Sequence, residues 1–415
     1  MTIAQAIESA HADYETLSEK CRVFDERLFI DAVRAGGEKY AELLQLAVRQ
    51  TVSSHKAVLD ENGEILFISK ECHSNGCAAT VDVSYPSIPF FLLYNPELVR
   101  GMMRPIYKYA ARPEWTYDFA PHDVGRYPKL NGQVYGLDLS KSATPALDKQ
   151  MPVEECGNML IMEAAAAVAS RDASFAASHM DILEKWVVYL TENGDDPQNQ
   201  LCTDDFAGHL AHNCNLSLKA IMGIECMAIL CRMTGRDEQA QKYTETARAM
   251  ARRWMVNAAE GDGSYRLAFD QPGTFSMKYN IVWDKLFGTK IMPPEMFGTE
   301  ILSYRAKAHP YGLPLDSRKP YTKSDWLVWT ATLSPDRESF EELVEPLWTM
   351  YNLTSSRVPM TDWYYTITGL HKSYISRRYT SRDAELPKIE KSFRNRSVIG
   401  GLFIKLLEFS GKMKI

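Results

Sequence analysis

The sequence predicts an all-α protein, a closed ring of helical hairpins that also carries one small β-hairpin. Apolar residues recur at spacings of three and four along most of the chain, which is the pattern of amphipathic helices. Short turns join some of these helices, whereas loops of about 15 to 40 residues, far longer than the usual connection, join others. No linker rich in Gly, Ser or Pro divides the 415 residues, so we expect a single domain over residues 1–415.

Helices are expected wherever the apolar spacing persists over several turns. The clearest segments are 4–22, 37–57, 96–111, 155–170, 174–193, 215–234, 237–259, 296–308, 337–353 and 396–409. Weaker segments with the same tendency are 25–34, 86–94, 277–287 and 324–333. A tight turn joins two of the long helices, because Gly235 suits the end of one and Asp237 the start of the next.

The β-hairpin is expected near residues 56–69. Lys56 to Asp60 and Glu64 to Ser69 flank the triplet Glu61-Asn62-Gly63. Asn-Gly between two apolar runs is a strong signal for a hairpin turn.

Composition and charge limit the classes of partner that this protein is expected to bind. The formal net charge is −6 and the basic residues are scattered, which argues against a nucleic-acid partner. No run of eighteen apolar residues occurs and Met1 to Ala10 contain no apolar signal segment, so we expect neither a membrane partner nor a visible leader. The eight dispersed cysteines are expected to be buried free thiols in a reducing compartment.

Six long loops combine carboxylates with His, Trp, Tyr and Gly. They include Ser69–Gly76 with Asp82, Glu114–Gly125, Met151–Asn158, Cys202–Asn213, Leu315–Trp326 and Pro359–Tyr365. Aromatic faces cover the C–H surface of a polar substrate, carboxylates accept from its O–H and N–H groups, and a carboxyl of raised pKa protonates a leaving group. The alternative is that Asp residues such as Asp325 only cap the helices that follow them.

The acidic pairs Glu154-Glu155 and Asp204-Asp205 need separate consideration. Adjacent acids at the start of a helix can simply complement the helix dipole. Successive residues also point in different directions, so at most one of each pair is expected to face a pocket.

Metal, cofactor and nucleophile motifs are weak. His209 and His212 could share one helical face with Cys202 and Asp205 nearby, but this is a partial ligand set, so no metal and no cofactor are expected. The chain contains no Gly-x-Ser-x-Gly elbow, phosphate loop or dinucleotide fingerprint.

The order of these loops resembles the six-helical-hairpin domain of the glutaminase A family over about residues 12–409. Segments that carry the resemblance include Ala35-Gly36-Gly37, Ser69-Lys70-Glu71, Ser74-Asn75-Gly76, Thr80–Val83, Phe91–Leu98, Phe119–Gly125, Asn131-Gly132-Gln133, Met151–Leu160, Asn199–Asn213, Lys278-Tyr279-Asn280, Leu313–Asp316, Tyr321–Trp326, Pro359–Trp363 and Arg396–Gly401. The resemblance implies an (α/α)6 toroid, similar to that of several glycoside hydrolase families. It also implies hydrolysis of the side-chain amide of L-glutamine.

Family members usually carry β-rich domains ahead of this one and a secretion signal. The resemblance therefore implies a secreted or periplasmic protein with an N-terminal β-rich partner domain. The absence of a signal in this chain points instead to the cytoplasm, and the localisation stays open.

Three functions are compatible with these loops. The first is a hydrolase of glutamine or a related amide, the second is a glycoside hydrolase with an acid-base pair, and the third is a non-catalytic module that binds carbohydrate or peptide. The predicted catalytic acids are Glu154, Glu155, Asp204, Asp205, Asp325 and Asp362. The predicted substrate contacts are Glu71, Asp82, His122 and Asp123, the cations Arg318, Lys319 and Lys323, and the walls Trp115, Tyr321, Trp326 and Trp363.

Overall fold

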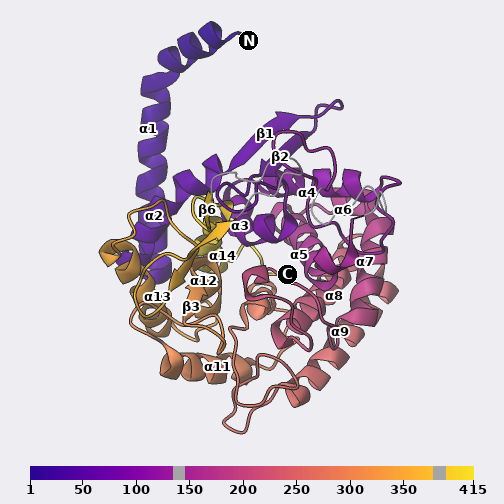
Figure 1. Cartoon of the computed structure of the whole chain (residues 1–415). Helices are drawn as coiled ribbons and strands as arrows, with labels where there is room; N and C mark the ends of the chain where they lie inside the picture. The colour runs from indigo at the N-terminus through magenta and orange to yellow at the C-terminus, as the bar shows by residue number, and fades with distance from the viewer. Residues whose placement is uncertain (134–144, 377–388) are drawn as a thin grey trace, which may run out of the picture.

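The protein is a ring of helices that alternate along the chain between an outer and an inner position (Figure 1). This computed structural model describes residues 1–133, 145–376 and 389–415. The outer helices are α2 (Glu38–Ser53), α4 (Pro96–Ala110), α7 (Met180–Asn193), α9 (Asp237–Asn257), α11 (Pro294–Lys307) and α13 (Arg337–Leu353). The inner helices are α3 (Val81–Tyr94), α5 (Pro152–Ser170), α8 (Cys214–Met233), α10 (Val282–Phe287), α12 (Ser324–Ala331) and α14 (Ile404–Ser410). Together they form the (α/α)6 toroid that the sequence predicts.

Inner and outer helices differ in sequence because they differ in environment. Nearly every residue of α3, α5, α8 and α12 is buried, and these helices are apolar or small-residue-rich on all sides. The outer helices α7, α9 and α13 bury one stripe only, as amphipathic helices do, whereas α4 is buried over most of its length. Helix α8 is long and apolar enough to cross a membrane, but its apolar window is fully buried inside the ring, where a core helix has the same composition.

Short 3₁₀ segments precede several inner helices or interrupt the loops. They are η1 (Leu147–Lys149), η2 (Asp205–Ala207), η3 (Tyr279–Ile281) before α10 and η4 (Ser397–Phe403) before α14. A short helix, α6 (Ser174–Ser178), lies between α5 and α7. The turn between α8 and α9 has the expected form, with Gly235 at φ +75°.

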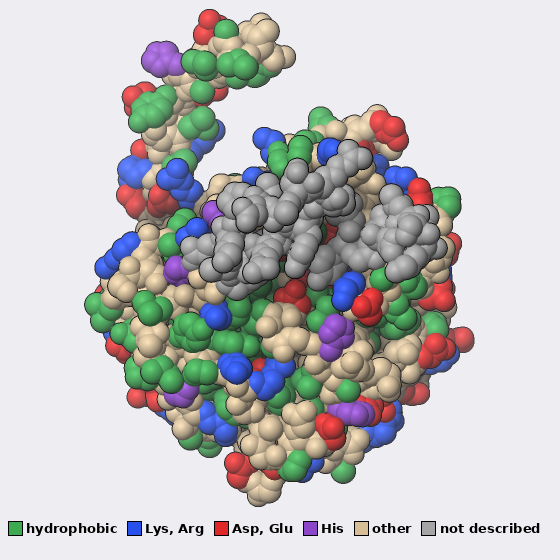
Figure 2. Space-filling model, viewed as in Figure 1, with side chains coloured by type: hydrophobic (Ala, Val, Ile, Leu, Met, Phe, Trp, Pro, Cys, Tyr) green, Lys and Arg blue, Asp and Glu red, His purple; other side chains and the backbone are tan. Residues whose placement is uncertain are grey.

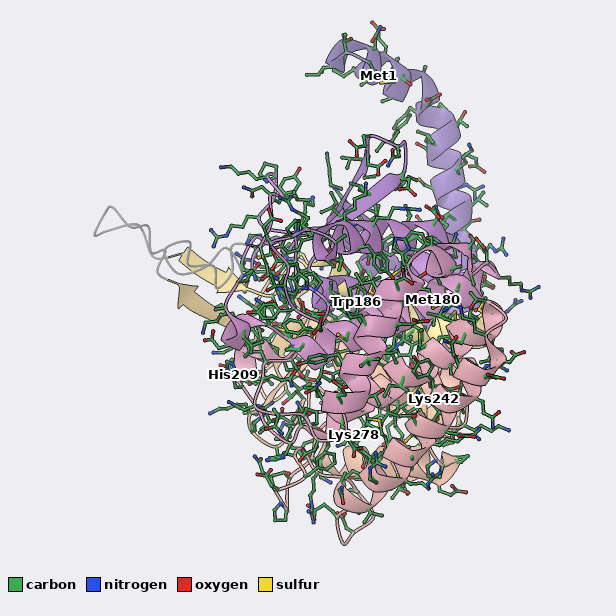
Figure 3. All side chains as sticks on the ribbon, turned by 90° about the vertical axis from the view of Figure 1, so that its right-hand side faces the viewer. Met1, Met180, Trp186, His209, Lys242 and Lys278 are labelled. Carbon is green, nitrogen blue, oxygen red and sulfur yellow. The ribbon has the colours of Figure 1, made fainter. Side chains whose placement is uncertain are left out.

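The first helix, α1 (Ile3–Gly36), merges two segments that the sequence separates, 4–22 and 25–34. Its C-terminal turns bury Leu28, Ala32 and Ala35 against the ring. Its N-terminal part is exposed and projects away from the body, with Met1 near the tip (Figure 3).

Three two-stranded sheets are present in the described part of the chain. The hairpin of β1 (His55–Leu59) and β2 (Ile65–Ser69) was predicted. Because β1 begins at His55, helix α2 ends at Ser53 rather than at the expected residue 57. The pairs β3 (Tyr321–Lys323) with β4 (Trp363–Tyr365), and β5 (Ser373–Ser376) with β6 (Ile389–Ser392), were not predicted. Strands of three or four residues leave little periodic signal in a sequence.

Candidate active site

The inner helices bring their first turns, and the acids in them, to one face of the ring. Asp82 lies in the first turn of α3, Glu154 and Glu155 in that of α5, and Asp325 in that of α12. Helix N-termini carry a partial positive charge that stabilises carboxylates. The ring therefore concentrates acids where long loops meet the inner helices.

A cavity of about 420 Å³ opens at this face. In the space-filling view, acidic and basic side chains lie near one another in the middle of the face, beside the atoms that are not described (Figure 2). The cavity is lined by Glu71, Ser74, Asn75, Asp82, Val83, His122, Thr203, Asp205, Phe206, Lys319, Tyr321, Trp363, Lys372, Phe393 and Arg396. Seven of the predicted site residues are therefore together in one cavity: Glu71, Asp82, His122, Asp205, Lys319, Tyr321 and Trp363.

One side of the cavity is a buried acidic cluster around His122. Donor atoms of Asp82, His122 and Glu155 all lie within 4.8 Å of one another. The Nε2 atom of His122 is 3.5 Å from Oδ1 of Asp82, and its Nδ1 atom is 2.7 Å from Oδ2 of Asp123. Asp123 also accepts a hydrogen bond from the backbone N–H of Gly125.

The loop that presents His122 depends on a glycine. Gly125 has φ +105°, and a Cβ atom there would lie 2.3 Å from the carbonyl oxygen of Gly132. Only glycine fits this close approach of two backbone segments. Substitution of Gly125 is thus expected to displace Asp123 and, through it, His122.

The protonation of the cluster is strongly perturbed. Burial raises the pKa of Asp82 to about 7 and raises the pKa of Glu155 well above its usual range. Burial acts against a charge on His122, but the hydrogen bond to Asp123 and the charge of Asp82 raise the pKa of His122 well above its usual value. Perturbed values of this kind are concentrated at functional sites.

Two further carboxylates face the cavity from loops. Asp205 begins the 3₁₀ segment η2 and is half-buried, and burial raises its pKa. Glu71 accepts hydrogen bonds from the hydroxyls of Ser74 and Thr80, which fix both of its oxygens. Asp205 is therefore the less constrained of the two.

The cavity lining also contains three cations, and one of them, Arg396, lies 4.0 Å from Glu71. Arg396 donates to both oxygens of Asp362, at 2.6 Å and 3.3 Å, and its guanidinium lies 3.8 Å from the centre of the Phe393 ring. Lys372 lies over the rings of Trp363 and Tyr365, and Lys319 is exposed at the rim. The lining thus presents three positive groups to a ligand.

Asp325, Asp362 and Lys323 lie beneath Arg396 rather than in the cavity. Lys323 Nζ is 3.3 Å from Oδ2 of each aspartate, and all three side chains are almost completely buried. Burial raises the pKa of Asp325 to about 6. These three residues are therefore not in the lining of this cavity, and Asp362 holds Arg396.

The predicted acids Glu154 and Asp204 are also engaged below the cavity. Glu154 forms a buried ion pair with Lys219 at 3.1 Å. Asp204 accepts a hydrogen bond from Tyr279 at 3.1 Å, and burial raises its pKa to about 7. In each acidic pair, the second residue lies closer to the cavity or the cluster, as expected from the different directions of successive side chains.

Besides Lys323, four of the predicted substrate contacts lie outside the cavity lining. Trp115 is buried and donates to the carbonyl of Phe119, and Trp326 is buried and stacks on Tyr279 at 4.1 Å. Arg318 pairs with Asp316 at 2.7 Å in a neighbouring groove. Asp123 contacts His122 rather than the cavity itself.

Eight cavity residues were not predicted as site residues: Ser74, Asn75, Val83, Thr203, Phe206, Lys372, Phe393 and Arg396. Arg396 belongs to a segment that resembles the glutaminase A family, so the resemblance is the one signal that could have found it. Lys372 and Phe393 come from the last loop, which carries no motif.

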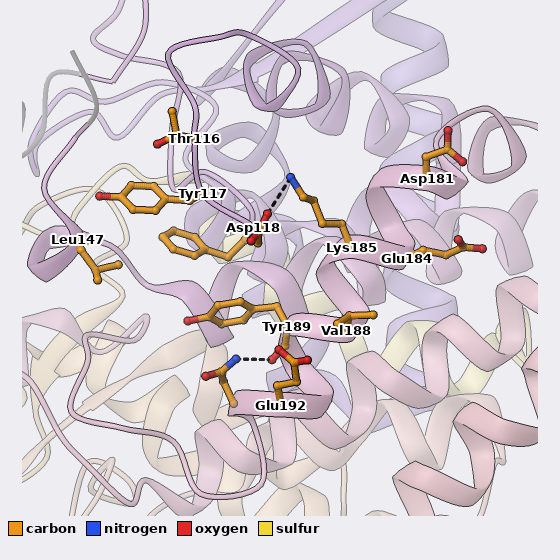
Figure 4. A pocket seen from close by; sticks show the side chains of 12 residues that line it. Thr116, Tyr117, Asp118, Leu147, Asp181, Glu184, Lys185, Val188, Tyr189 and Glu192 are labelled. Atoms are coloured by element: carbon orange, nitrogen blue, oxygen red, sulfur yellow. Dashed lines mark hydrogen bonds and ion pairs between the residues drawn. The ribbon is translucent and has the colours of Figure 1, made fainter. Parts of the chain in front are cut away.

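A larger cavity lies elsewhere, between the loop at residues 116–119 and the outer helix α7. This open groove has a volume of about 790 Å³ and contains the aromatic side chains of Tyr117, Phe119 and Tyr189 (Figure 4). Its acids are at the surface, where Asp118 pairs with Lys185 at 2.9 Å. Because it has no buried cluster of acids, we assign the candidate site to the smaller cavity.

His209 and His212, which the sequence offers as a partial metal-ligand set, lie apart from the cluster of acids around His122. His209 is exposed at the loop edge of the ring (Figure 3) and contacts the carbonyl of Asp148, while His212 pairs with Asp196. Within residues 1–133, 145–376 and 389–415, these two do not form a cluster of metal-ligating atoms.

Comparisons with known proteins agree with this architecture. Glutaminase A from Aspergillus oryzae is 33% identical over 412 residues, which are 98% of this chain and 55% of that protein. A probable glutaminase from Arthroderma benhamiae is 28% identical over 429 aligned positions, covering 83% of this chain and 48% of that protein. The chain thus spans about half the length of the curated relatives it matches.

Solved structures with the same fold include glycosidases. A structure from Streptococcus pneumoniae described as a metal-independent α-mannosidase has a TM-score of 0.58 at 10% identity, and the match covers 94% of this chain and 98% of that one. The model of the glutaminase A six helical-hairpin domain matches residues 37–406. The chain therefore belongs to the glutaminase A family and contains its six helical-hairpin domain.

Proposed function

We propose that this protein is a hydrolase that cleaves the side-chain amide of L-glutamine or a closely related small amide. The observation that carries the proposal is the mixed charge of the cavity lining. It combines the carboxylates Asp82, Asp205 and Glu71 with the cations Lys319, Lys372 and Arg396, and Arg396 approaches Glu71 to 4.0 Å. An amino acid has a carboxylate for the cations and an ammonium group for the acids. The names of the two fungal relatives, a glutaminase A and a probable glutaminase, support the same substrate.

In this proposal Arg396 anchors the substrate carboxylate. Its planar guanidinium is held by Asp362 and by the ring of Phe393, and a fixed guanidinium recognises carboxylates with directed hydrogen bonds. Lys372 and Lys319 add positive charge at the rim. Tyr321 and Trp363 then cover the apolar methylene groups between the two charged ends.

Asp205 is the proposed proton carrier. Hydrolysis consumes one water, forms a C–O bond, breaks the C–N bond and transfers a proton from the water to the departing nitrogen. Asp205 faces the cavity and forms no ion pair with the residues that the structure describes, so it is suited to accept that proton and pass it on. The neighbouring cluster of Asp82, His122 and Glu155 is the group that holds the attacking water.

Glycoside hydrolysis is the second candidate, because the cavity has the aromatic walls Tyr321, Trp363, Phe206 and Phe393. One argument disfavours it, because a neutral sugar needs no cationic groups. The spacing of the acids does not decide between the two candidates, since oxygens of Asp82 and Glu155 lie within 4.8 Å of each other and the acids of a retaining glycosidase stand about 5–5.5 Å apart.

A substrate panel tests the proposal. Release of ammonia from L-glutamine, lost in an Asp205→Asn variant, supports an amidohydrolase. The matched control is Asp118→Asn in the groove beside α7, which we expect to retain turnover. Release of reducing sugar from oligosaccharides, without ammonia from glutamine, assigns the protein to the glycoside hydrolases. Ligand binding without any turnover makes it a binding module.

A further inference from the structure

The cluster of Asp82, His122 and Glu155 combines ligand types that bind divalent metal ions. One imidazole nitrogen and two carboxylates converge within 4.8 Å. All three side chains are at least nine-tenths buried. Oδ1 of Asp82 and Oε1 of Glu155 have no hydrogen-bond partner among the described residues. Buried carboxylate oxygens are costly without a partner, which indicates that they face a positively charged ligand.

The separation of these donor atoms also fits a shared ion. Nε2 of His122 and Oδ1 of Asp82 are 3.5 Å apart, which is long for a hydrogen bond. Two ligands bound to one metal ion at about 2.1 Å with a tetrahedral angle lie about 3.4 Å apart. The observed distance is therefore close to that between two ligands of one ion.

Neighbouring side chains hold His122 and Glu155 in position in the way that is common around metal ligands. Asp123 is 2.7 Å from Nδ1 of His122, so that Nε2 is the nitrogen turned toward Asp82. Asn158 donates to Oε2 of Glu155 at 2.9 Å and leaves Oε1 for another partner. A carboxylate behind a ligating histidine and a hydrogen bond behind a ligating carboxylate are recurrent features of metal centres.

An ion can reach the cluster through the cavity, because Asp82 and His122 both line it. We propose that Asp82, His122 and Glu155 bind one divalent transition-metal ion of the Zn²⁺ class at the floor of this cavity. Mixed nitrogen and oxygen ligands suit this class better than Mg²⁺ or Ca²⁺, which prefer oxygen alone. When bound, such an ion supplies Lewis acidity to a water or a carbonyl oxygen. The site itself stands on the geometry of the cluster, whereas its use in amide hydrolysis rests on the proposed function.

The test measures metal binding directly, with Zn²⁺ and Co²⁺ as the probes. The purified chain is treated with a chelator, dialysed, loaded with one probe and passed through a desalting column. We expect about one equivalent of Zn²⁺ to be retained, and visible absorption bands from the Co²⁺ form. Asp82→Asn combined with Glu155→Gln is expected to lower retention at least tenfold, and Asp123→Asn to weaken the affinity about 10- to 100-fold.

The matched control is Glu163→Gln, a buried acid on the same helix as Glu155 that hydrogen-bonds Tyr107 instead. This variant is expected to bind like the wild type. Circular dichroism establishes that each variant is folded, and single Asp82→Asn replaces the double variant if the latter is not. The inference is overturned if the wild type retains no ion, or if a folded Asp82→Asn variant retains as much as the wild type.

The metal-binding experiment and the glutamine assay can fail independently of each other. Retention of Zn²⁺ without ammonia release leaves the metal site standing and overturns the proposed function. Ammonia release by a protein that binds no ion supports the proposed function and overturns the metal site.

Discussion

Two buried charged regions lie side by side in this ring, and they differ in charge balance. In the group beneath Arg396, two cations, Lys323 and Arg396, meet two anions, Asp325 and Asp362. In the cluster around His122, three carboxylates, Asp82, Asp123 and Glu155, surround a single imidazole. Buried charges are tolerated when opposite charges compensate them.

The difference indicates separate roles for the two regions. In the balanced group each aspartate lies 3.3 Å from Lys323, and Asp362 keeps Arg396 in position. The cluster has an excess of negative groups, and it is stable only with extra protons or a cation. We therefore expect substitutions of Lys323, Asp325 and Asp362 to affect mainly stability, and those at the cavity, including Arg396, to affect mainly activity.

The largest expected effect is on turnover. Asp205→Asn removes the proposed proton carrier while keeping the size of the side chain, so kcat/KM for glutamine is expected to fall about 10²- to 10⁴-fold. Its free energy of unfolding is expected to change by less than about 1 kcal/mol, because Asp205 is only half-buried. Steady-state kinetics and urea denaturation check both values. If the free energy of unfolding fell by as much as the free energy that corresponds to the loss of kcat/KM, Asp205 would have a structural role as well, which would contradict our proposal.

The next largest effect is on stability. Asp362→Ala leaves Lys323 and Arg396 with one anion fewer in a buried place, so the free energy of unfolding is expected to fall by about 3–5 kcal/mol. Glu341→Ala is the control, because it breaks only the exposed pair with Arg337 and is expected to cost less than about 1 kcal/mol. Chemical denaturation measures both variants. Equal losses of unfolding free energy would show that the buried group contributes no more to stability than an exposed ion pair.

A third prediction concerns pH and a buried acid away from both regions. Burial raises the pKa of Glu163 to about 7, although Tyr107, Arg100 and Arg104 lower it. Its folded pKa lies above its unfolded value, so its favourable contribution is complete below about pH 4.5 and disappears as pH rises through 7.

Glu163→Gln is therefore expected to be more stable relative to the wild type at pH 8 than at pH 4.5, by about 3 kcal/mol. Thermal or urea unfolding at both pH values measures the difference. A stability difference between variant and wild type that stays constant with pH would show that Glu163 titrates normally.

The smallest expected effect is on substrate affinity. Arg396→Lys keeps the positive charge but loses the planar pair of donors, so the KM for glutamine is expected to rise about 5- to 30-fold with little change in kcat. Arg357→Lys, a surface substitution, serves as the control. An unchanged KM in the Arg396→Lys variant would place the substrate carboxylate elsewhere.

The fold could be predicted from the sequence because its signals are local. The apolar spacing of α8 and α9 and the turn at Gly235 lie within a few dozen residues of each other. The strands β3 and β4 were not predicted, because they are short and pair residues about 40 positions apart. Their pairing nevertheless matters, because it brings Tyr321 and Trp363 to the same cavity.

The site could be predicted only in part. The sequence marks the loops that contain Asp82, His122 and Asp205, but it does not tell which acids are neutralised by a buried cation. Glu154 was indistinguishable from Glu155 until Lys219 was found beside it. Arg396 and Lys372 were missed because their importance depends on contacts across the ring rather than on a local motif.

The most direct test of the account is the release of ammonia from L-glutamine by the purified chain, measured together with glutamate formation in the wild type and the Asp205→Asn variant. The account predicts equal amounts of ammonia and glutamate from the wild type, and at least a hundredfold slower release from the variant. No ammonia from the wild type, or the same rate from both proteins, would contradict it.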